Sequence, residues 1–287
     1  MSAAATTLLR EWLGHRLDAP RLAWLDAQIA SLQRAPGAAD LAIGFGLVPR
    51  RIGNADLALT DTDRAAAGRA LDGWTPHGWS VADAARILLL STVSAASENF
   101  ATTFRGLCVT ADVAELTSLY RGLPLYAGPA ALLDQVAEGL RSNMRSVFEA
   151  IVHHSPYPKT HFDEHRWNHM VLKALFVGSP LAPIQGLDAR ANAELARMLC
   201  DFAHERQAAG RTVPYAIWRC VGPFARGPAL DDLARVLADR ADSTGQRAAA
   251  LALAACPEPR AAHLLQEAPA LSAEISTRRL TWDTLQH

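Results

Sequence analysis

The sequence predicts an all-α protein, an antiparallel array of helices resembling a HEAT-like α-solenoid. Three observations favour this class. Alanine and leucine dominate the 287 residues, whereas the β-branched residues valine and isoleucine are comparatively few. Apolar positions recur at three- and four-residue spacing in most segments, which is the period of a helix surface. Prolines punctuate the chain where helices should begin or end, and they leave room for helices of roughly ten to twenty residues.

The N-terminal part contains one clear helix and one exception to the helical pattern. Met1 to Leu17 mixes leucines with charged residues, so it predicts an amphipathic helix and lacks the apolar stretch of a secretory signal. Leu41 to Asn54 is apolar and contains Gly44, Gly46 and Pro49 without a helical period. We expect an ordered loop there.

Two capping signals predict helix starts further along the chain. Ser80 and Asp83 have the spacing of a capping box and precede a long apolar stretch. Thr160 and Asp163 offer the same signal for a helix that continues through Val177. Each pair predicts a helix that begins at its first member.

The segment after Gly227 predicts short alternating helices of the kind that stack in α-solenoids. The helices expected here are Ala229 to Arg240, Gln246 to Ala255 and Pro259 to Gln266. We therefore divide the chain into N-terminal helices with the ordered loop (1–75), a helical core (76–227) and a repeat-like C-terminal segment (228–287). One continuous domain is the alternative.

Charge, apolar stretches and cysteine content argue against several classes of protein. Lysine and arginine total 28 against 29 aspartates and glutamates, so no overall field favours nucleic acid. No apolar stretch approaches the roughly 20 residues of a membrane span. The four cysteines form no Cys-x-x-Cys pair, which predicts reduced thiols in a cytoplasmic protein rather than disulfides or a thiolate zinc site.

Histidines form the densest ionisable cluster. Five of the ten lie between residues 153 and 169. On one helix, His161, His165 and His169 would share a face, and His161 with His165 is the candidate pair for a divalent metal. All three would not bind one ion, because the outer two are separated by about 12 Å along a helix.

The stretch from His161 to His165 also matches the H-x-x-E-H pattern of inverted zincins. A peptidase of that class needs a third ligand and a mixed α/β fold, and the sequence favours neither. Two other interpretations stay open: the solvated face of an ordinary surface helix, and a metal or acid/base role outside peptidases.

Two further polar concentrations would favour a phosphate or carboxylate ligand if stacked helices brought their arginines into one groove. One is Arg141, Asn143, Arg145 and Glu149; the other is His204, Glu205 and Arg206, followed by Trp218 and Arg219.

Collinear segments of the chain resemble the EboA family between roughly residues 85 and 225. They are Ala111 to Leu116, Leu119 to Pro124, Glu138 to Met144, Val147 to Ile151, Ser155 to Pro158, Trp167 to Phe176, Leu187 to Asn192, His204 to Arg206, and Trp218 with Arg219. Ser155, His169 and Gln207 depart from the family pattern, and His161 and His165 are not family features.

The resemblance implies a role in small-molecule biosynthesis or its supporting machinery. EboA-like proteins are encoded in gene clusters together with a prenyltransferase, a cyclase and other enzymes. These clusters are tied to secondary metabolites and to the export of a pigment precursor. The family supplies no established reaction. The residues that it implies for a pocket are Arg141, Asn143, Glu149, Tyr157, Trp167, Asn168, Lys173, His204, Glu205, Arg206, Trp218 and Arg219.

Three functional hypotheses follow. The first is an enzyme of specialised metabolism whose groove binds a polar or anionic substrate (a cyclitol, a sugar phosphate or a prenyl-linked intermediate), with Glu149, His204 and Glu205 handling protons. The second is a non-catalytic helical scaffold for a biosynthetic or transport partner from the same cluster. The third is a metal-dependent enzyme that uses the histidines of residues 153–169.

Overall fold

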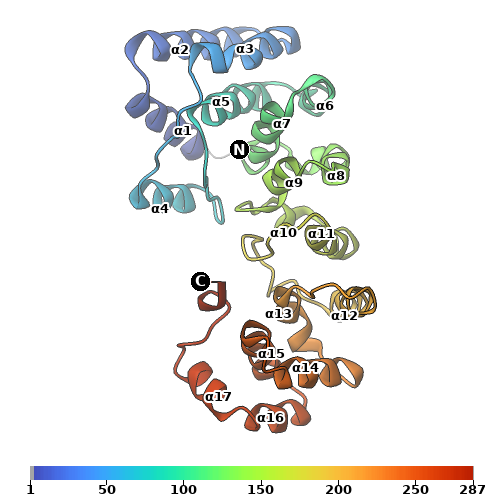
Figure 1. Ribbon diagram of the computed structural model, residues 1–287. Helices are drawn as coiled ribbons and strands as arrows, with labels where there is room; N and C mark the ends of the chain where they lie inside the picture. Colours follow the sequence, from blue (N-terminus) through green and yellow to red (C-terminus); the bar gives the residue numbers. More distant parts are fainter. Residues whose placement is uncertain (1–2, 287) are drawn as a thin grey trace. The chain divides into compact units, whose positions relative to one another are not determined.

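The structure, a computed structural model that describes residues 3–286, is all-α (Figure 1). Its described residues are 71% helical, with 17 α-helices and no strand, which confirms the predicted class. They form two compact units. The first comprises the described residues up to Phe162 together with Pro183–Gln185, and the second comprises Asp163–Ala182 and the described residues from Gly186 onward. The unit boundary falls inside the 76–227 segment; the three-part division and the HEAT-like arrangement stay predictions.

The first unit is built around one buried helix, α5 (Val81–Ala96), in which 13 residues are buried. Helices α1, α2, α3 and α7 pack against α5, as Figure 1 shows. The bounds of the other elements are α1 (Ala3–Arg16), α2 (Ala19–Arg34), α3 (Ala38–Arg51), α4 (Asp61–Ala70), α6 (Phe100–Thr110), α7 (Val113–Arg121), α8 (Leu133–Arg141), α9 (Arg145–Val152) and α10 (Tyr157–His161), with short 3-10 turns η1 (Leu123–Leu125) and η2 (Pro129–Leu132).

Two predicted helix starts in this unit are confirmed. Helix α1 occupies the predicted N-terminal segment. Helix α5 begins at the predicted capping box: Ser80 Oγ accepts a hydrogen bond from the Asp83 backbone N–H at 3.0 Å, and Asp83 Oδ2 accepts one from the Ser80 N–H at 2.9 Å. The reciprocal bonds satisfy donors that the first helical turn leaves open.

The prediction of an ordered loop at Leu41 to Asn54 is wrong, because α3 covers most of that segment. Gly44 permits a close approach: a Cβ there would lie 2.9 Å from Gln28 Oε1. Pro49 lacks the N–H that would bond to the carbonyl of Phe45, and the buried Arg86 on α5 donates to that carbonyl instead, Nε to O at 3.3 Å. Packing against α5 therefore supports a helix that its glycines and proline disfavour.

The second unit contains the C-terminal helices. The predicted helices after Gly227 are confirmed as α14, α15 and α16, and α17 follows them. The bounds are α11 (Glu164–Phe176), α12 (Ala193–Ala208), α13 (Trp218–Val221), α14 (Pro228–Ala238), α15 (Ser243–Ala255), α16 (Pro259–Gln266) and α17 (Pro269–Ser276), with 3-10 turns η3 (Tyr215–Ile217), η4 (Gly222–Phe224) and η5 (Thr284–Gln286).

The prediction that a helix starts at Thr160 and continues through Val177 is also wrong. Asp163 is itself the N-cap of α11 and accepts a hydrogen bond from the Arg166 N–H at 2.7 Å. Thr160 belongs to the separate helix α10, and Phe162 between them is extended. His161 therefore lies on a different helix from His165 and His169, so the three do not form the predicted ladder.

Two chain-wide properties concern membranes and thiols. Within residues 3–286, no helix combines the length and apolar character needed to cross a membrane. All four cysteines are free thiols. Burial raises the pKa of Cys108 and of Cys220 to about 12, so these thiols stay protonated at neutral pH.

Candidate functional site

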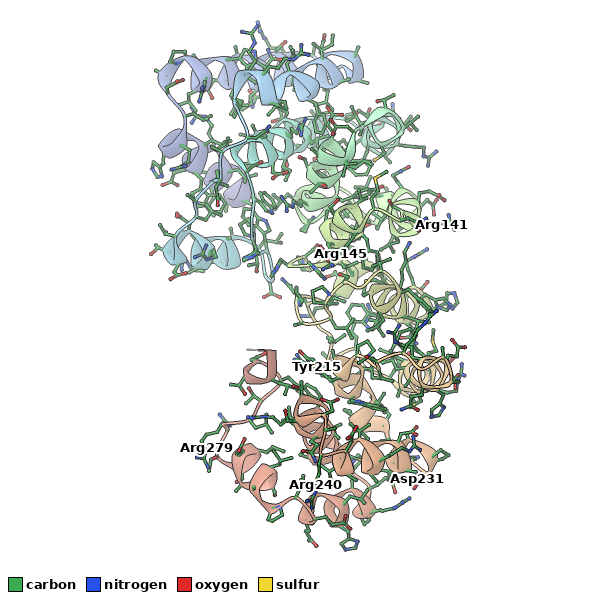
Figure 2. All side chains as sticks on the ribbon, in the orientation of Figure 1. Arg141, Arg145, Tyr215, Asp231, Arg240 and Arg279 are labelled. Carbon is green, nitrogen blue, oxygen red and sulfur yellow. The ribbon has the colours of Figure 1, made fainter. Side chains whose placement is uncertain are left out.

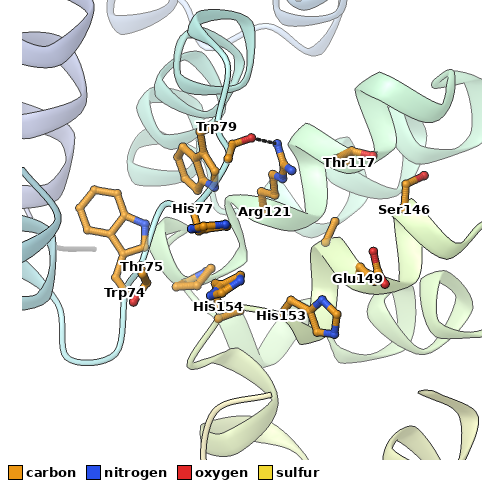
Figure 3. Close-up of a pocket in the computed structure, with 14 residues that line it drawn as sticks. Trp74, Thr75, His77, Trp79, Thr117, Arg121, Ser146, Glu149, His153 and His154 are labelled. Atoms are coloured by element: carbon orange, nitrogen blue, oxygen red, sulfur yellow. Dashed lines mark hydrogen bonds between the residues drawn. The ribbon is translucent and has the colours of Figure 1, made fainter. Parts of the chain in front are cut away.

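The first unit contains a polar pocket of about 240 Å³, which we call the His–Trp pocket (Figure 3). Its lining includes Trp74, His77, Arg121, Glu149, His153 and His154. These residues come from the loop between α4 and α5, the end of α7, helix α9 and the residues that follow α9. Segments distant in sequence thus meet around one cavity.

Hydrogen bonds to the backbone fix the two loops that carry the aromatic rings. The chain around Trp79 pairs with residues 55–57 through an antiparallel bridge between Asp56 and Ser80. Gln185 Nε2 donates to the Gly73 carbonyl at 2.6 Å. The backbone N–H of His154, a residue in the left-handed region with φ of 53°, donates to the Pro183 carbonyl at 3.0 Å.

Aromatic rings form one wall of the pocket. The rings of Trp74 and Trp79 lie edge to face with centroids 6.1 Å apart. The imidazoles of His77 and His154 lie 4.5 Å apart, and neither has a hydrogen-bond partner for its ring nitrogens among the described residues. This wall combines apolar faces with open polar edges, which suits a small ligand of mixed character.

Trp74 has an unsatisfied donor at this wall. Its side chain is 1% exposed, and its Nε1 has no hydrogen-bond partner among the described residues. Figure 3 shows the indole nitrogen on the edge of the ring that faces His77 and His154. A buried N–H without an acceptor is costly, so this donor is evidence for a group that accepts from it.

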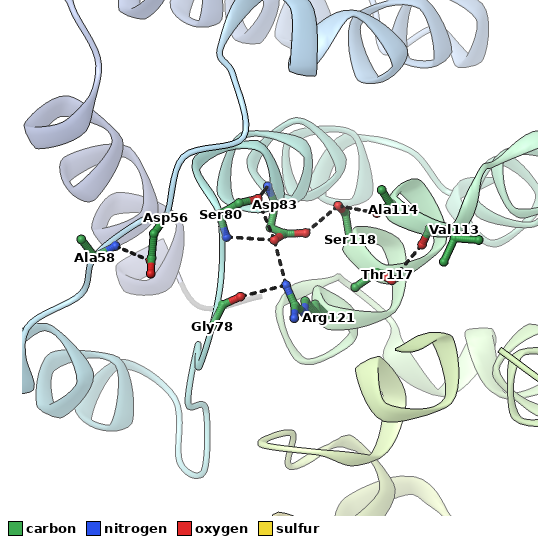
Figure 4. A network of polar contacts seen from close by, with 10 residues as sticks. All are labelled: Asp56, Ala58, Gly78, Ser80, Asp83, Val113, Ala114, Thr117, Ser118 and Arg121. Atoms are coloured by element: carbon green, nitrogen blue, oxygen red, sulfur yellow. Dashed lines mark hydrogen bonds and ion pairs between the residues drawn. The ribbon is translucent and has the colours of Figure 1, made fainter. Parts of the chain in front are cut away.

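Arg121 is held at the pocket by a buried carboxylate (Figure 4). Its Nη1 donates to Asp83 Oδ2 at 2.8 Å and to the Gly78 carbonyl at 3.2 Å. Asp83 also accepts from the Ser80 hydroxyl and from the Ser118 hydroxyl, each at 2.8 Å. Nε and Nη2 of Arg121 have no partner in the part of the chain that the structure describes.

His154 has a strongly lowered pKa, mainly because it is buried. Burial, followed by the charges of His77, His153 and Arg121, lowers the pKa of His154 to about 4. His154 is therefore neutral at physiological pH, with one ring nitrogen able to donate and the other able to accept.

Glu149 is the one sequence-predicted catalytic residue in the lining of this pocket. Its Oε1 accepts a hydrogen bond from Arg145 Nε at 2.6 Å. His153 and His154 come from the predicted histidine cluster. The sequence interpretation missed Trp74, His77 and Arg121, because only tertiary contacts bring their segments to α9.

The other predicted residues of the first unit lie outside this lining. Arg141 is exposed at the end of α8 (Figure 2), and it pairs with Glu138 on the same helix. Asn143 is exposed as well. Tyr157 is buried, and its hydroxyl donates to the Pro129 carbonyl at 2.8 Å.

In the second unit, several predicted residues are engaged in packing and ion pairs. Trp167 and Trp218 are buried, and Lys173 is half-buried, with a pKa lowered by burial. Asn168 and Asn192 exchange amide hydrogen bonds of 3.1 and 2.9 Å. Arg219 forms a bidentate pair with Asp188 at 2.6 and 2.7 Å.

His204 has a buried partner that sequence spacing did not suggest. Its Nε2 lies 2.6 Å from Oδ2 of Asp232, whose side chain is 4% exposed. The partner is on α14, 28 residues downstream. Neighbouring Glu205 is exposed, and Arg206 donates to the Thr212 carbonyl at 2.6 Å.

The metal prediction concerns His161 on α10 and His165 on α11. The ring of His161 lies 4.7 Å from that of Tyr157, and the ring of His165 lies 4.1 Å from that of His169. Within residues 3–286, no three His, Cys, Asp or Glu side chains are grouped to hold a metal ion. A metal at His161 and His165 stays a prediction.

Comparison with known proteins gives one match. A family model described as "Metabolite traffic protein EboA" matches residues 5–222, most of the chain. The chain belongs to the EboA family. No curated protein and no solved structure matches it. The EboA match includes every residue of the His–Trp pocket, and it extends the similarity seen in the sequence to the N-terminal helices.

Proposed function

We propose that this EboA protein takes part in metabolite traffic by binding a small polar metabolite in the His–Trp pocket. The family description supports the class of function. The observation that carries the choice of site is the Trp74 indole N–H, which is buried at the pocket wall without an acceptor. A bound metabolite with an acceptor atom satisfies this donor.

The first prediction is that purified protein retains a metabolite through Trp74. Protein made without an affinity tag is denatured, and the released small molecules are identified by mass spectrometry. We expect W74F to retain about tenfold less of the compound than the wild type, because phenylalanine keeps most of the ring and removes the donor.

The control is W24F, since Trp24 is half-buried on α2 and does not line the pocket. Equal retention by the wild type and both variants would contradict the proposed site. Absence of any retained compound that is specific to the wild type would contradict metabolite binding itself.

Catalysis is a second candidate function, favoured by the contact between His204 and Asp232. A buried carboxylate that fixes an imidazole resembles the orienting pair of general-base sites. We expect H204N to lower the rate at which the retained compound is converted when it is incubated with pure protein. Identical conversion by H204N and wild type, or none by either, would contradict this candidate.

A further inference from the structure

We propose that the ligand of the His–Trp pocket carries an oxyanion, a carboxylate or a phosphate, that accepts hydrogen bonds from Trp74 Nε1 and from the open N–H groups of Arg121. This inference rests on the proposed function and adds the chemical class of the metabolite. It is supported by the balance of donors, the placement of Arg121 and the charges around the pocket.

Trp74 and Arg121 add three open donor nitrogens and no acceptor to the pocket. Trp74 Nε1 can only donate, and so can Nε and Nη2 of Arg121. The neutral ring of His154 adds one donor and one acceptor. A ligand rich in acceptors satisfies this set, whereas a neutral ligand with as many donors as acceptors leaves N–H groups unmatched.

Arg121 is oriented before any ligand binds. Its carboxylate partner Asp83 accepts four hydrogen bonds, from the Ser80 N–H, the Ser80 hydroxyl, the Ser118 hydroxyl and Arg121 Nη1. Because Asp83 engages Nη1, one edge of the guanidinium is fixed and the remaining N–H groups stay available (Figure 4). A planar guanidinium with two open donors matches the geometry of an oxyanion.

The carboxylate in the pocket lining does not cancel this preference. Glu149 is 26% exposed at its side chain and is paired with Arg145. Burial is the largest cause of the lowered pKa of His154, and the charges of His77, His153 and Arg121 follow; the permanent charge among these groups is the guanidinium of Arg121. A potential that repels a proton attracts an anion.

This potential predicts linkage between anion binding and protonation. A bound anion stabilises protonated His154 and raises its pKa from about 4. The complex therefore binds more protons than the unliganded protein, and anion affinity increases as the pH falls from 8 towards 5. His77 and His153 also line the pocket, so a variant at His154 is needed to isolate the contribution of His154 to the pH dependence.

The experiment is titration calorimetry of the full chain with inorganic phosphate, malonate, sulfate and glucose. We expect phosphate or malonate to bind and glucose not to bind, and the tighter of the two anions identifies the group. R121Q should weaken anion binding about tenfold, since it removes a charged donor. R105Q, which removes the same charge from an exposed position on α6, should change affinity less than twofold.

W74F provides a second variant that leaves the Asp83 network intact, and it should also weaken anion binding. Sulfate, whose charge is constant between pH 5 and 8, tests the linkage. We expect its affinity to rise towards pH 5 in the wild type and to rise less in H154N, because asparagine tolerates the positive φ at this position.

Two results would overturn the inference and spare the proposed function. One is glucose binding in preference to the anions. The other is Trp74-dependent retention of a metabolite by protein that binds none of the three anions. If the wild type binds no anion and retains no metabolite, both proposals fail.

Discussion

At the scale of single residues, the pocket depends on one carboxylate that touches no ligand. Asp83 caps α5, bonds to Ser118 on α7 and holds Arg121 at the cavity. Asp83 is 7% exposed and accepts four hydrogen bonds, so its side chain has little freedom to move when one of its partners is altered. Asp83 therefore couples the stability of the first unit to the placement of Arg121.

The Asp83→Asn substitution tests this role. The amide keeps the size of the side chain, removes the charge and turns one acceptor into a donor that faces the N–H of Arg121. We expect the free energy of unfolding to fall by about 2 to 4 kcal/mol, measured by urea denaturation.

The control for this measurement is Asp61→Asn, which makes the same change at the first residue of α4, where the side chain is fully exposed. The decrease in the free energy of unfolding of Asp61→Asn should lie within the error of the urea denaturation measurement. An equal loss in both variants would mean that the Asp83 network contributes nothing specific.

At the scale of elements, local signals were sufficient where they agreed with tertiary packing. The capping box at Ser80 and Asp83 predicted α5 correctly because both its local bonds and its apolar faces favour a helix. At α3 the glycines and Pro49 disfavoured the helix that packing produces, and Arg86, 41 residues away, supplies the bond that Pro49 cannot. Such support has no signature in the segment itself.

The candidate site shows the same limit. Glu149, His153 and His154 were found because they lie together in a polar segment of the chain. Trp74 and His77 were missed, since their loop meets α9 through contacts such as Gln185 with Gly73, 112 residues apart. Spacing along one helix also suggested a ladder of histidines, which the extended Phe162 interrupts.

At the scale of the whole molecule, two units divide the predicted residues between them. The first holds a pocket with open donors, a fixed arginine and the buried imidazole of His154, whose pKa is lowered. The second holds ion pairs, an amide pair and the contact between His204 and Asp232. Membership of the EboA family and these donors together support metabolite binding in the first unit.

The most direct test is the NMR signal of the Trp74 indole N–H in ¹⁵N-labelled protein. The chain has seven tryptophans, and the signal that W74F lacks identifies Trp74. We predict that saturation with the retained metabolite, or with the anion that binds, moves this signal downfield and slows its exchange with solvent, while the Trp24 signal stays in place. An unchanged Trp74 signal in protein saturated with ligand would contradict the account.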